Sequence, residues 1–350
     1  MPDPGTSGLL AWPDAVQAGW PDEGVAAHYG DPLREQRATE ESAGVVDRSN
    51  RGVVRITGPD RLSWLHSLTT QALDGLAPGG SAQALILSPN GHVEHHLTLT
   101  DDGTATWLHV EPGTAAALVE FLESMRFMLR VEVADVSQDH AVLTVLGPGA
   151  SDIAAGLEGV RASVNPGPFG TIDLIVARDR LAGAAGDLVR RGAAVAGMWA
   201  FEALRIAAHV PRLGLDTDHR TIPHEVGWID AAVRLDKGCY RGQETVARVH
   251  NLGHPPRRLV FLSLDGSEDR LPGHGDPVAL ASDEQRATIG FTGSAARHYE
   301  LGPIGLALVK RTVPVEATLL AGGVPAAQEV IVPPDAGANV KVTLRRRQLM

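Results

Sequence analysis

Two stretches, GVVRITGP at Gly52–Pro59 and AVLTVLGP at Ala141–Pro148, decide the fold of this chain. Each is a run of apolar and β-branched residues that ends in a Gly-Pro pair, which is typical of a buried strand followed by a tight turn. The residues after the first pair place Leu62, Leu65 and Leu68 on one face of a helix, and a helix of small residues follows the second pair. This repetition predicts two related units in which helices and strands alternate.

Both halves close with a strand and an amphipathic helix, and the first half is the longer one. Its extra residues contain a predicted hairpin, which turns at Ser88-Pro89-Asn90-Gly91. A feature present in only one of two related units is a natural place to search for a site. The predicted closing strands and helices are 107–110 with 114–128 and 173–177 with 181–191, and the predicted hairpin strands are 83–87 and 93–100.

The flanks of these units have a different character. Residues 1–40 form a lead-in with a surface helix predicted after Asp31-Pro32, and composition leaves open whether it is a loose arm or a cover over a cavity. After His254, short β-rich runs fit an antiparallel β-barrel or sandwich, with strands predicted at 258–264, 277–280, 288–292, 305–309 and 329–332. The predicted fold class is α+β, divided into 1–40, 41–137, 138–253 and 254–350.

Composition excludes several classes of protein. The 350 residues are 43% hydrophobic and 21% charged, as in an ordinary soluble chain, and 31 basic against 42 acidic residues give a net charge of −11, which disfavours direct nucleic-acid binding. The single cysteine, Cys239, excludes an internal disulfide and a Cys-cluster metal site. No apolar run is long enough for a membrane span, so we expect a cytoplasmic protein without a membrane partner.

The segment Asp236–Glu244, DKGCYRGQE, is the most informative candidate site. Cys239 lies between Lys237 and Arg241 and before a predicted helix, 243–249, so that two cations and free helix amides would favour the reactive thiolate. The alternative is a buried, inert thiol beside a tight turn. Spacing alone leaves both interpretations open.

The hairpin strand supplies a second candidate. Simple alternation places His92, Glu94 and His96 on one face and Val93, His95, Leu97 and Leu99 on the other. A His-x-Glu-x-His strand is compatible with a metal ion, but no fourth ligand is identifiable, and we expect no metal site. His95, on the apolar face, is a candidate general acid or base and also fits a core histidine.

Lys237–Glu244, KGCYRGQE, resembles the KGCYxGQE signature of the YgfZ-type folate-binding proteins, which are relatives of the glycine-cleavage T-protein. Further landmarks follow in the order of that superfamily: the D-x-S-x-x-G-like segment that starts at Asp47, the turn at Gly58-Pro59 and the helix that contains Glu202–Arg205. The resemblance covers roughly residues 40–330.

The resemblance implies a ring of two α/β units and a terminal β-barrel, with tetrahydrofolate in the central cavity. It also implies a role in assembly or repair of iron–sulfur proteins, including radical enzymes that modify tRNA, with Lys237 and Cys239 tied to that role. Iron–sulfur client or assembly proteins would be the partners. Cofactor-binding positions assigned in this way are Asp47, Asn90, Phe201, Arg205, Tyr240, Gln243 and Glu244, with Phe201 and Tyr240 as stacking candidates.

Two departures from the T-protein bear on activity. The T-protein hairpin ends in Gly-Gly-x-x-Asp-Asp, whereas Gly91–His96 lacks that acid, and the acid that holds the pterin ring is replaced by Ala207. The leading prediction is therefore a tetrahydrofolate-binding accessory factor. The alternatives are a folate-dependent aminomethyl or one-carbon transferase that uses His95, and a scaffold that binds no folate and acts through Cys239.

Overall fold

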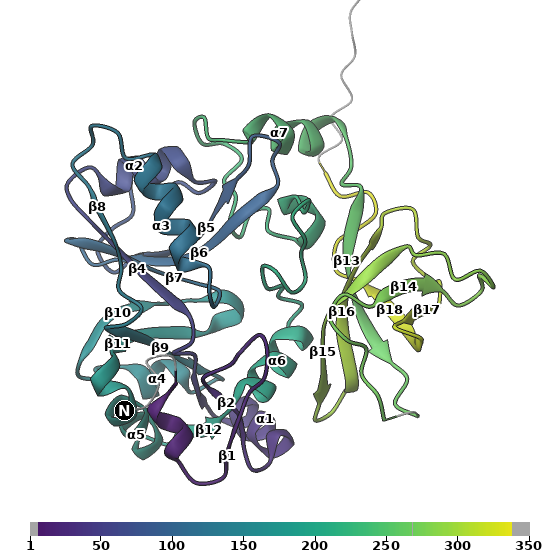
Figure 1. Ribbon diagram of the computed structural model, residues 1–350, viewed down its shortest axis with the longest axis horizontal. Coiled ribbons are helices and arrows are strands. Elements are labelled where there is room, and N and C mark those ends of the chain that lie inside the picture. Colours follow the sequence, from purple (N-terminus) through teal and green to yellow (C-terminus); the bar gives the residue numbers. More distant parts are fainter. Residues whose placement is uncertain (1–5, 268, 338–350) are drawn as a thin grey trace, which may run out of the picture.

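The computed structural model describes residues 6–267 and 269–337, and its parts are arranged around a central segment (Figure 1). Two α/β units lie on one side and a β-barrel lies on the other, as the predicted fold class requires. The outermost residues of the first and last predicted segments, 1–5 and 338–350, lie outside the described residues.

The first unit is a five-stranded antiparallel sheet in the order β5-β6-β7-β4-β8. Helices α2 and α3 cover one face and bury Leu65, Leu118 and Leu122 against the sheet. The predicted hairpin is confirmed as β5 and β6. The elements are β4 Gly52–Thr57, α2 Arg61–Leu68, β5 Ser81–Leu87, β6 Val93–Asp101, β7 Ala105–Val110, α3 Ala115–Ser124 and β8 Glu132–Asp135.

The second unit has the strand order β10-β11-β9-β3-β12. Helices α4 and α5 cover its outer face, and its inner face packs on the first sheet through Val142, Ala162 and Ile175. The two units thus form four layers: helices, sheet, sheet, helices (Figure 1). The elements are β9 His140–Leu146, α4 Ala150–Ala154, β10 Val160–Val164, β11 Ile172–Ala177, α5 Leu181–Arg190 and β12 Ala194–Ala196.

One predicted assignment is wrong. Residues 41–51 were placed in the first unit, but β3, Gly44–Asp47, lies in the second sheet, where it pairs with β9 and, in parallel, with β12. In the first unit β4 and β8 are neighbours and pair directly. Their counterparts in the second unit, β9 and β12, are not neighbours and leave room for one more strand between them. A strand from earlier in the chain fills that gap.

The two Gly-Pro turns have the same backbone conformation. Gly58 and Gly147 adopt φ values of +106° and +104°. In both turns a Cβ would collide with a backbone carbonyl oxygen, that of Arg130 or that of Thr39. The repeated sequence therefore encodes the same close approach of two chain segments in each unit.

The lead-in is packed against the second unit. Helix α1, Pro32–Glu41, begins as predicted, and Asp31 accepts hydrogen bonds from the amides of Leu33 and Arg34 at its N-terminus. Glu35 lies on the buried side, where it accepts hydrogen bonds from the amides of Tyr29 (2.6 Å) and Gly197 (2.9 Å). The preceding elements are a 3-10 turn Gly8–Ala11, β1 Ala15–Gln17 and β2 Ala26–Tyr29.

The C-terminal part is a closed antiparallel barrel in the order β13-β16-β15-β14-β17-β18. Its interior is filled by aliphatic side chains such as Val260, Leu262 and Val309. The sequence missed β17, and the last predicted strand, 329–332, is in fact β18, which ends at Val330. The strands are β13 Arg257–Leu264, β14 Pro277–Leu280, β15 Gly290–His298, β16 Gly302–Lys310, β17 Leu319–Ala321 and β18 Val324–Val330.

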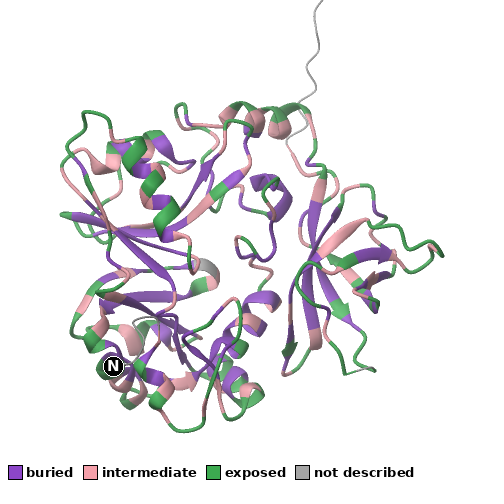
Figure 2. Cartoon of the chain, viewed as in Figure 1, coloured by how far each residue is buried: buried purple, intermediate pink, exposed green. Residues whose placement is uncertain are grey.

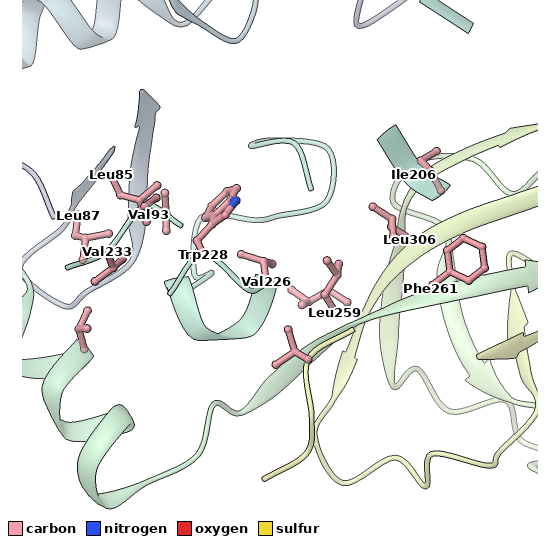
Figure 3. Close-up of a cluster of buried hydrophobic side chains, with 14 of the residues drawn as sticks. Leu85, Leu87, Val93, Ile206, Val226, Trp228, Val233, Leu259, Phe261 and Leu306 are labelled. Carbon is pink, nitrogen blue, oxygen red and sulfur yellow. The ribbon is translucent and has the colours of Figure 1, made fainter. Parts of the chain in front are cut away.

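Residues 208–256 connect the second unit to the barrel through the centre of the molecule. This segment contains the 3-10 turn Pro223–Val226 and α7, Gln243–Leu252. Val226 and Trp228 pack between the hairpin and the barrel, so one apolar core joins the first unit to the barrel (Figure 3). Helix α6, Met198–Ala207, begins the connection and lies between the second unit and β15.

Burial follows this layering. The strands are buried along most of their length, and exposed residues gather on the outer helices and loops (Figure 2). In the described residues, no helix has the length and apolar character that a membrane span requires.

Candidate functional site

Loop 237–244, the KGCYRGQE segment, packs against the tip of the hairpin. Gly242 has φ +81°, and a Cβ on it would lie 2.6 Å from the carbonyl oxygen of Ser88 and 3.0 Å from the Cα of Gly91. Asn90 is exposed in the same hairpin turn. Gly242 is thus needed for contact between the loop and the hairpin.

Lys237 is bound to backbone rather than free. Its Nζ donates hydrogen bonds to the carbonyl oxygens of His66, Thr69 (2.6 Å) and Gln71 (3.3 Å), at and just beyond the C-terminal end of α2. Burial lowers the pKa of Lys237 to about 8. This side chain therefore anchors the loop to backbone carbonyls in the last turn of α2 and in the residues that follow it.

The other residues of the loop divide into bound and exposed groups. Tyr240 is buried in the central core, where desolvation raises its pKa to about 12, and Gln243 donates to the carbonyl of Lys237 at 3.5 Å. Arg241 forms a salt bridge of 2.7 Å with Glu94 of the hairpin. Cys239 and Glu244 are exposed. The thiol is therefore accessible, contrary to the interpretation as a buried small residue.

Strand β6 does not alternate as predicted. A β-bulge interrupts its pairing with β5: Val93 pairs with Leu87 and His95 with Ile86, so Glu94 has no partner of its own. Val93 consequently packs in the central core, whereas Leu97 packs beneath α2 and α3. The prediction that Val93 shares a face with His95 and Leu97 is wrong because the bulge shifts the alternation.

The bulge decides which histidine faces the centre. His96 packs on Trp228, with ring centroids 4.6 Å apart, and bonds Gln83 Oε1 at 3.0 Å. Burial lowers its pKa to about 4. His95 lies beside Phe121 of α3 (6.1 Å) and close to Arg241, on the helix-covered side of the sheet, where burial also lowers its pKa.

Three residues predicted to bind cofactor have structural partners instead. Asp47 is buried, accepts hydrogen bonds from Ser7 Oγ and the amide of Ser49, and has a pKa that burial raises. Phe201 is 2% exposed, with the Arg48 guanidinium 4.3 Å from its ring centroid. Arg205 is 1% exposed and forms salt bridges with Glu202 and Asp216.

A buried network of charges, the charged junction, joins all parts of the chain. Arg212 makes salt bridges to Asp22 of the lead-in (3.0 Å), Glu111 of the first unit (2.7 Å) and Glu202 of α6 (2.9 Å). Arg205 bonds Glu202 (2.6 Å), Asp216 (3.0 Å) and Ser294 Oγ of β15 (2.7 Å). Sequence reasoning missed the junction, since Arg212 meets Asp22 and Glu111 only through contacts between segments far apart in the chain.

Electrostatics keep two carboxylates of this junction, those of Glu202 and Glu111, ionised. Burial alone would raise the pKa of Glu202, but Arg205 and Arg212 lower it to about 2. Glu111 behaves in the same way, with Arg212 and Arg51 holding its pKa well below the usual range against the effect of burial. The junction therefore remains a set of charge-assisted hydrogen bonds over the neutral pH range.

A cavity of about 790 Å³ lies next to the charged junction. It is lined by lead-in residues 18–22, the first turn of α6 and the barrel around 293–297. Two of its lining residues, Trp20 and Trp199, are 62% and 55% exposed. No residue of loop 237–244 lines this cavity, and neither does Ala207, the position predicted to have lost the pterin-holding acid.

The sequence contained only a faint signal for this site. Trp20 lies in the Pro- and Gly-rich lead-in and Trp199 at the start of a helix, so neither belongs to a motif. The structure bears on the question left open for the lead-in: residues 18–22 form one wall of the cavity, where Ala18 and Asp22 are buried and Trp20 is exposed. In the described part of the chain, no three His, Cys, Asp or Glu residues are placed to hold a metal ion, the His92–His96 strand included.

Comparisons with known proteins find a matching family model and several transferases. Residues 27–183 match the family model described as the GCVT N-terminal domain. A putative chloroplastic transferase of Arabidopsis thaliana is 24% identical over 81% of this chain and 70% of its own length. An aminomethyltransferase of Moorella thermoacetica is 27% identical over 81% of this chain and 83% of its own length.

Among solved structures, the glycine cleavage system aminomethyltransferase T of Bartonella henselae superposes with a TM-score of 0.78 at 20% identity, covering 95% of this chain and 98% of that one. The chain therefore has the T-protein fold. The family model and the relatives support the T-protein superfamily.

Proposed function

We propose that this protein, which has the T-protein fold, binds tetrahydrofolate and serves iron–sulfur proteins through loop 237–244, without transferring aminomethyl groups itself. The fold and the aminomethyltransferase relatives support the folate part of the proposal. The resemblance of KGCYRGQE to the YgfZ-type signature supports the iron–sulfur part.

One observation argues against aminomethyl transfer: no carboxylate of the hairpin faces the centre of the molecule. The residue that faces the centre on β6 is His96, whose pKa of about 4 makes it a weak general base. Glu94 lies in the bulge and is paired with Arg241. Neither residue reproduces an acid that would activate a folate nitrogen.

We put the folate at a place other than the predicted one. Phe201 and Arg205 are buried among structural partners and leave no surface for a ring. The cavity lined by Trp20 and Trp199 has a volume typical of small-molecule sites and exposed aromatic rings on its wall. Bound there, tetrahydrofolate would supply a carrier for one-carbon units.

In this proposal Lys237 and Cys239 divide the work of the loop. Lys237 positions the loop through carbonyls at and just beyond the end of α2, and Cys239 presents an accessible thiol to a partner. One thiol cannot hold an iron–sulfur cluster alone, so a partner protein or a small thiol supplies the other ligands.

The proposal is tested first by calorimetric titration of the anaerobic protein with tetrahydrofolate. We expect micromolar affinity, roughly −8 kcal/mol. No binding at millimolar ligand would contradict the folate part and favour a scaffold that acts through Cys239 alone.

Two assays separate the remaining alternatives. Formation of methylenetetrahydrofolate from an aminomethyl donor would show that the protein is a transferase, the activity named in its bacterial relatives. Cells that lack the protein should regain iron–sulfur enzyme activity with the wild type but not with Cys239→Ser. Full restoration by Cys239→Ser would remove the thiol from the proposal.

A further inference from the structure

His224 is a buried histidine whose ring has no hydrogen-bond partner. It lies in the 3-10 turn Pro223–Val226 and is 4% exposed. Both of its ring nitrogens are buried, and neither bonds any group of the described residues. The similarly buried His109, in contrast, uses both ring nitrogens, one toward Arg51 and one toward Asp173. A buried polar atom without a partner is uncommon in folded proteins and points to a group that the chain itself does not supply.

A second imidazole lies beside this one. His250 belongs to α7, which packs against the same 3-10 turn, and its ring centroid lies 6.0 Å from that of His224, with the ring planes 39° apart. Zinc lies about 2.0–2.1 Å from a ligating nitrogen, so two imidazoles that share one ion have ring centres roughly 5–6.5 Å apart. The observed separation falls within this range. His250 is only partly buried, which leaves a route for an ion from solvent.

The turn that carries His224 is fixed by bonds of its own. Glu225, the next residue, is fully buried and accepts hydrogen bonds from the amide of Ile222 (3.1 Å) and from the Arg257 side chain (2.8 Å). Arg257 also forms a salt bridge with Asp218. Because the turn is held in this way, its histidine loses little conformational entropy when it binds a ligand.

The chemistry of the pair favours a transition-metal ion. Burial, and then the neighbouring His250, lower the pKa of His224 to about 4, so its imidazole is neutral near pH 7 and has a lone pair to donate. Neutral imidazole is a common ligand of zinc and of its first-row neighbours, whereas calcium and magnesium prefer oxygen. Two histidines leave the remaining coordination positions to water or to groups of a partner, which is typical of an exchangeable ion rather than a structural one.

We infer that His224 and His250 together bind a divalent transition-metal ion of the zinc type at the contact between the 3-10 turn and α7. The site is separate from the cavity assigned to folate, since neither histidine lines that cavity. The inference therefore does not depend on the proposed function. A bound ion would tie α7, which continues loop 237–244, to the turn that packs between the hairpin and the barrel.

Calorimetric titration of the full chain with Zn²⁺ at pH 7 tests this assignment. The wild type should bind a single ion with micromolar affinity, and its melting temperature should rise with zinc by mass action. His250→Gln, at a partly exposed position of α7, should weaken binding more than about tenfold and abolish this rise. His219→Gln, at an exposed position, is the matched control and should bind zinc as the wild type does.

The other outcomes overturn the assignment. Absence of zinc binding by the wild type, or wild-type affinity in His250→Gln, would show that the two rings are only packed together. Loss of binding in Cys239→Ser would place the ion at the exposed thiol instead. His224→Gln adds a second test where its thermal unfolding shows that it is folded, and His250→Gln decides on its own where it is not.

Discussion

Loop 237–244 and the cavity between the lead-in and the barrel differ in which side chains remain accessible to a ligand or a partner. In the loop, Lys237 is bound to three carbonyls, Arg241 to Glu94 and Gln243 to the backbone, and the thiol of Cys239 is exposed. In the cavity, the backbone and the acids are tied into the fold, but two large indoles remain uncovered. A specific motif can thus be mainly structural, while a binding surface carries no motif.

The largest effect is expected where the cavity wall meets the charged junction. Arg212→Gln would leave Asp22, Glu111 and Glu202 buried without their shared cation, which should cost about 3–5 kcal/mol of the free energy of unfolding. Urea denaturation measures this cost. Arg248→Gln, at an exposed position on α7, is the control and should change stability by less than about 0.5 kcal/mol. Equal losses would show that the junction is not the element that holds the wall.

In the loop, the substitution expected to destabilise the protein most is at a glycine rather than at Lys237 or Cys239. Gly242→Ala adds a Cβ at φ +81°, against Ser88 and Gly91, and should destabilise the protein by about 2–4 kcal/mol. Gly238→Ala in the same loop is the matched control, since nothing lies within 4 Å of its added Cβ. Similar melting temperatures for the two variants would contradict the contact between loop and hairpin.

The burial of His96 in the hairpin is tested by the pH dependence of stability. The pKa of His96 is about 4 in the folded protein, below the ordinary value of 6.5, so the unfolded chain binds the proton first as the pH falls. Stability from this group is therefore complete above pH 6.5 and is lost toward pH 4, on the order of 2 kcal/mol. His96→Gln should flatten the pH dependence of stability in that window.

The exposed His219 supplies the control for this measurement, because His219→Gln should leave the pH profile as it is in the wild type. An unchanged profile in His96→Gln would mean that His96 titrates normally. It would then again be a candidate base at the centre.

The smallest expected effect distinguishes the structural role of Lys237 from the chemical role of Cys239. Lys237→Met removes the donor to the carbonyls after α2 and should cost about 1–2 kcal/mol, whereas Cys239→Ser should leave the melting temperature unchanged. Lys310→Met, which removes an exposed lysine bonded to one carbonyl, is the control. If Lys237→Met were as stable as the wild type, the lysine would be free for another role.

Much of the fold could be predicted because it is written in local patterns. The duplication followed from two Gly-Pro turns with the same conformation, and the hairpin from its Ser-Pro-Asn-Gly turn. The order of strands around β3 could not be predicted, because the sequence of a four-residue strand does not indicate the sheet in which it pairs. The bulge at Glu94 was also hidden, since one unpaired residue reverses alternation without changing composition.

By itself, the sequence determined the two α/β units, the barrel and the motif that contains the single thiol, because each depends on residues adjacent in the chain. Only the tertiary structure decided that Lys237 is an anchor, that His96 rather than His95 faces the centre, and that Trp20 and Trp199 share a cavity. These properties arise from contacts between segments far apart in the sequence. Long-range packing therefore selects which of the candidate side chains remain free to bind a ligand or a partner.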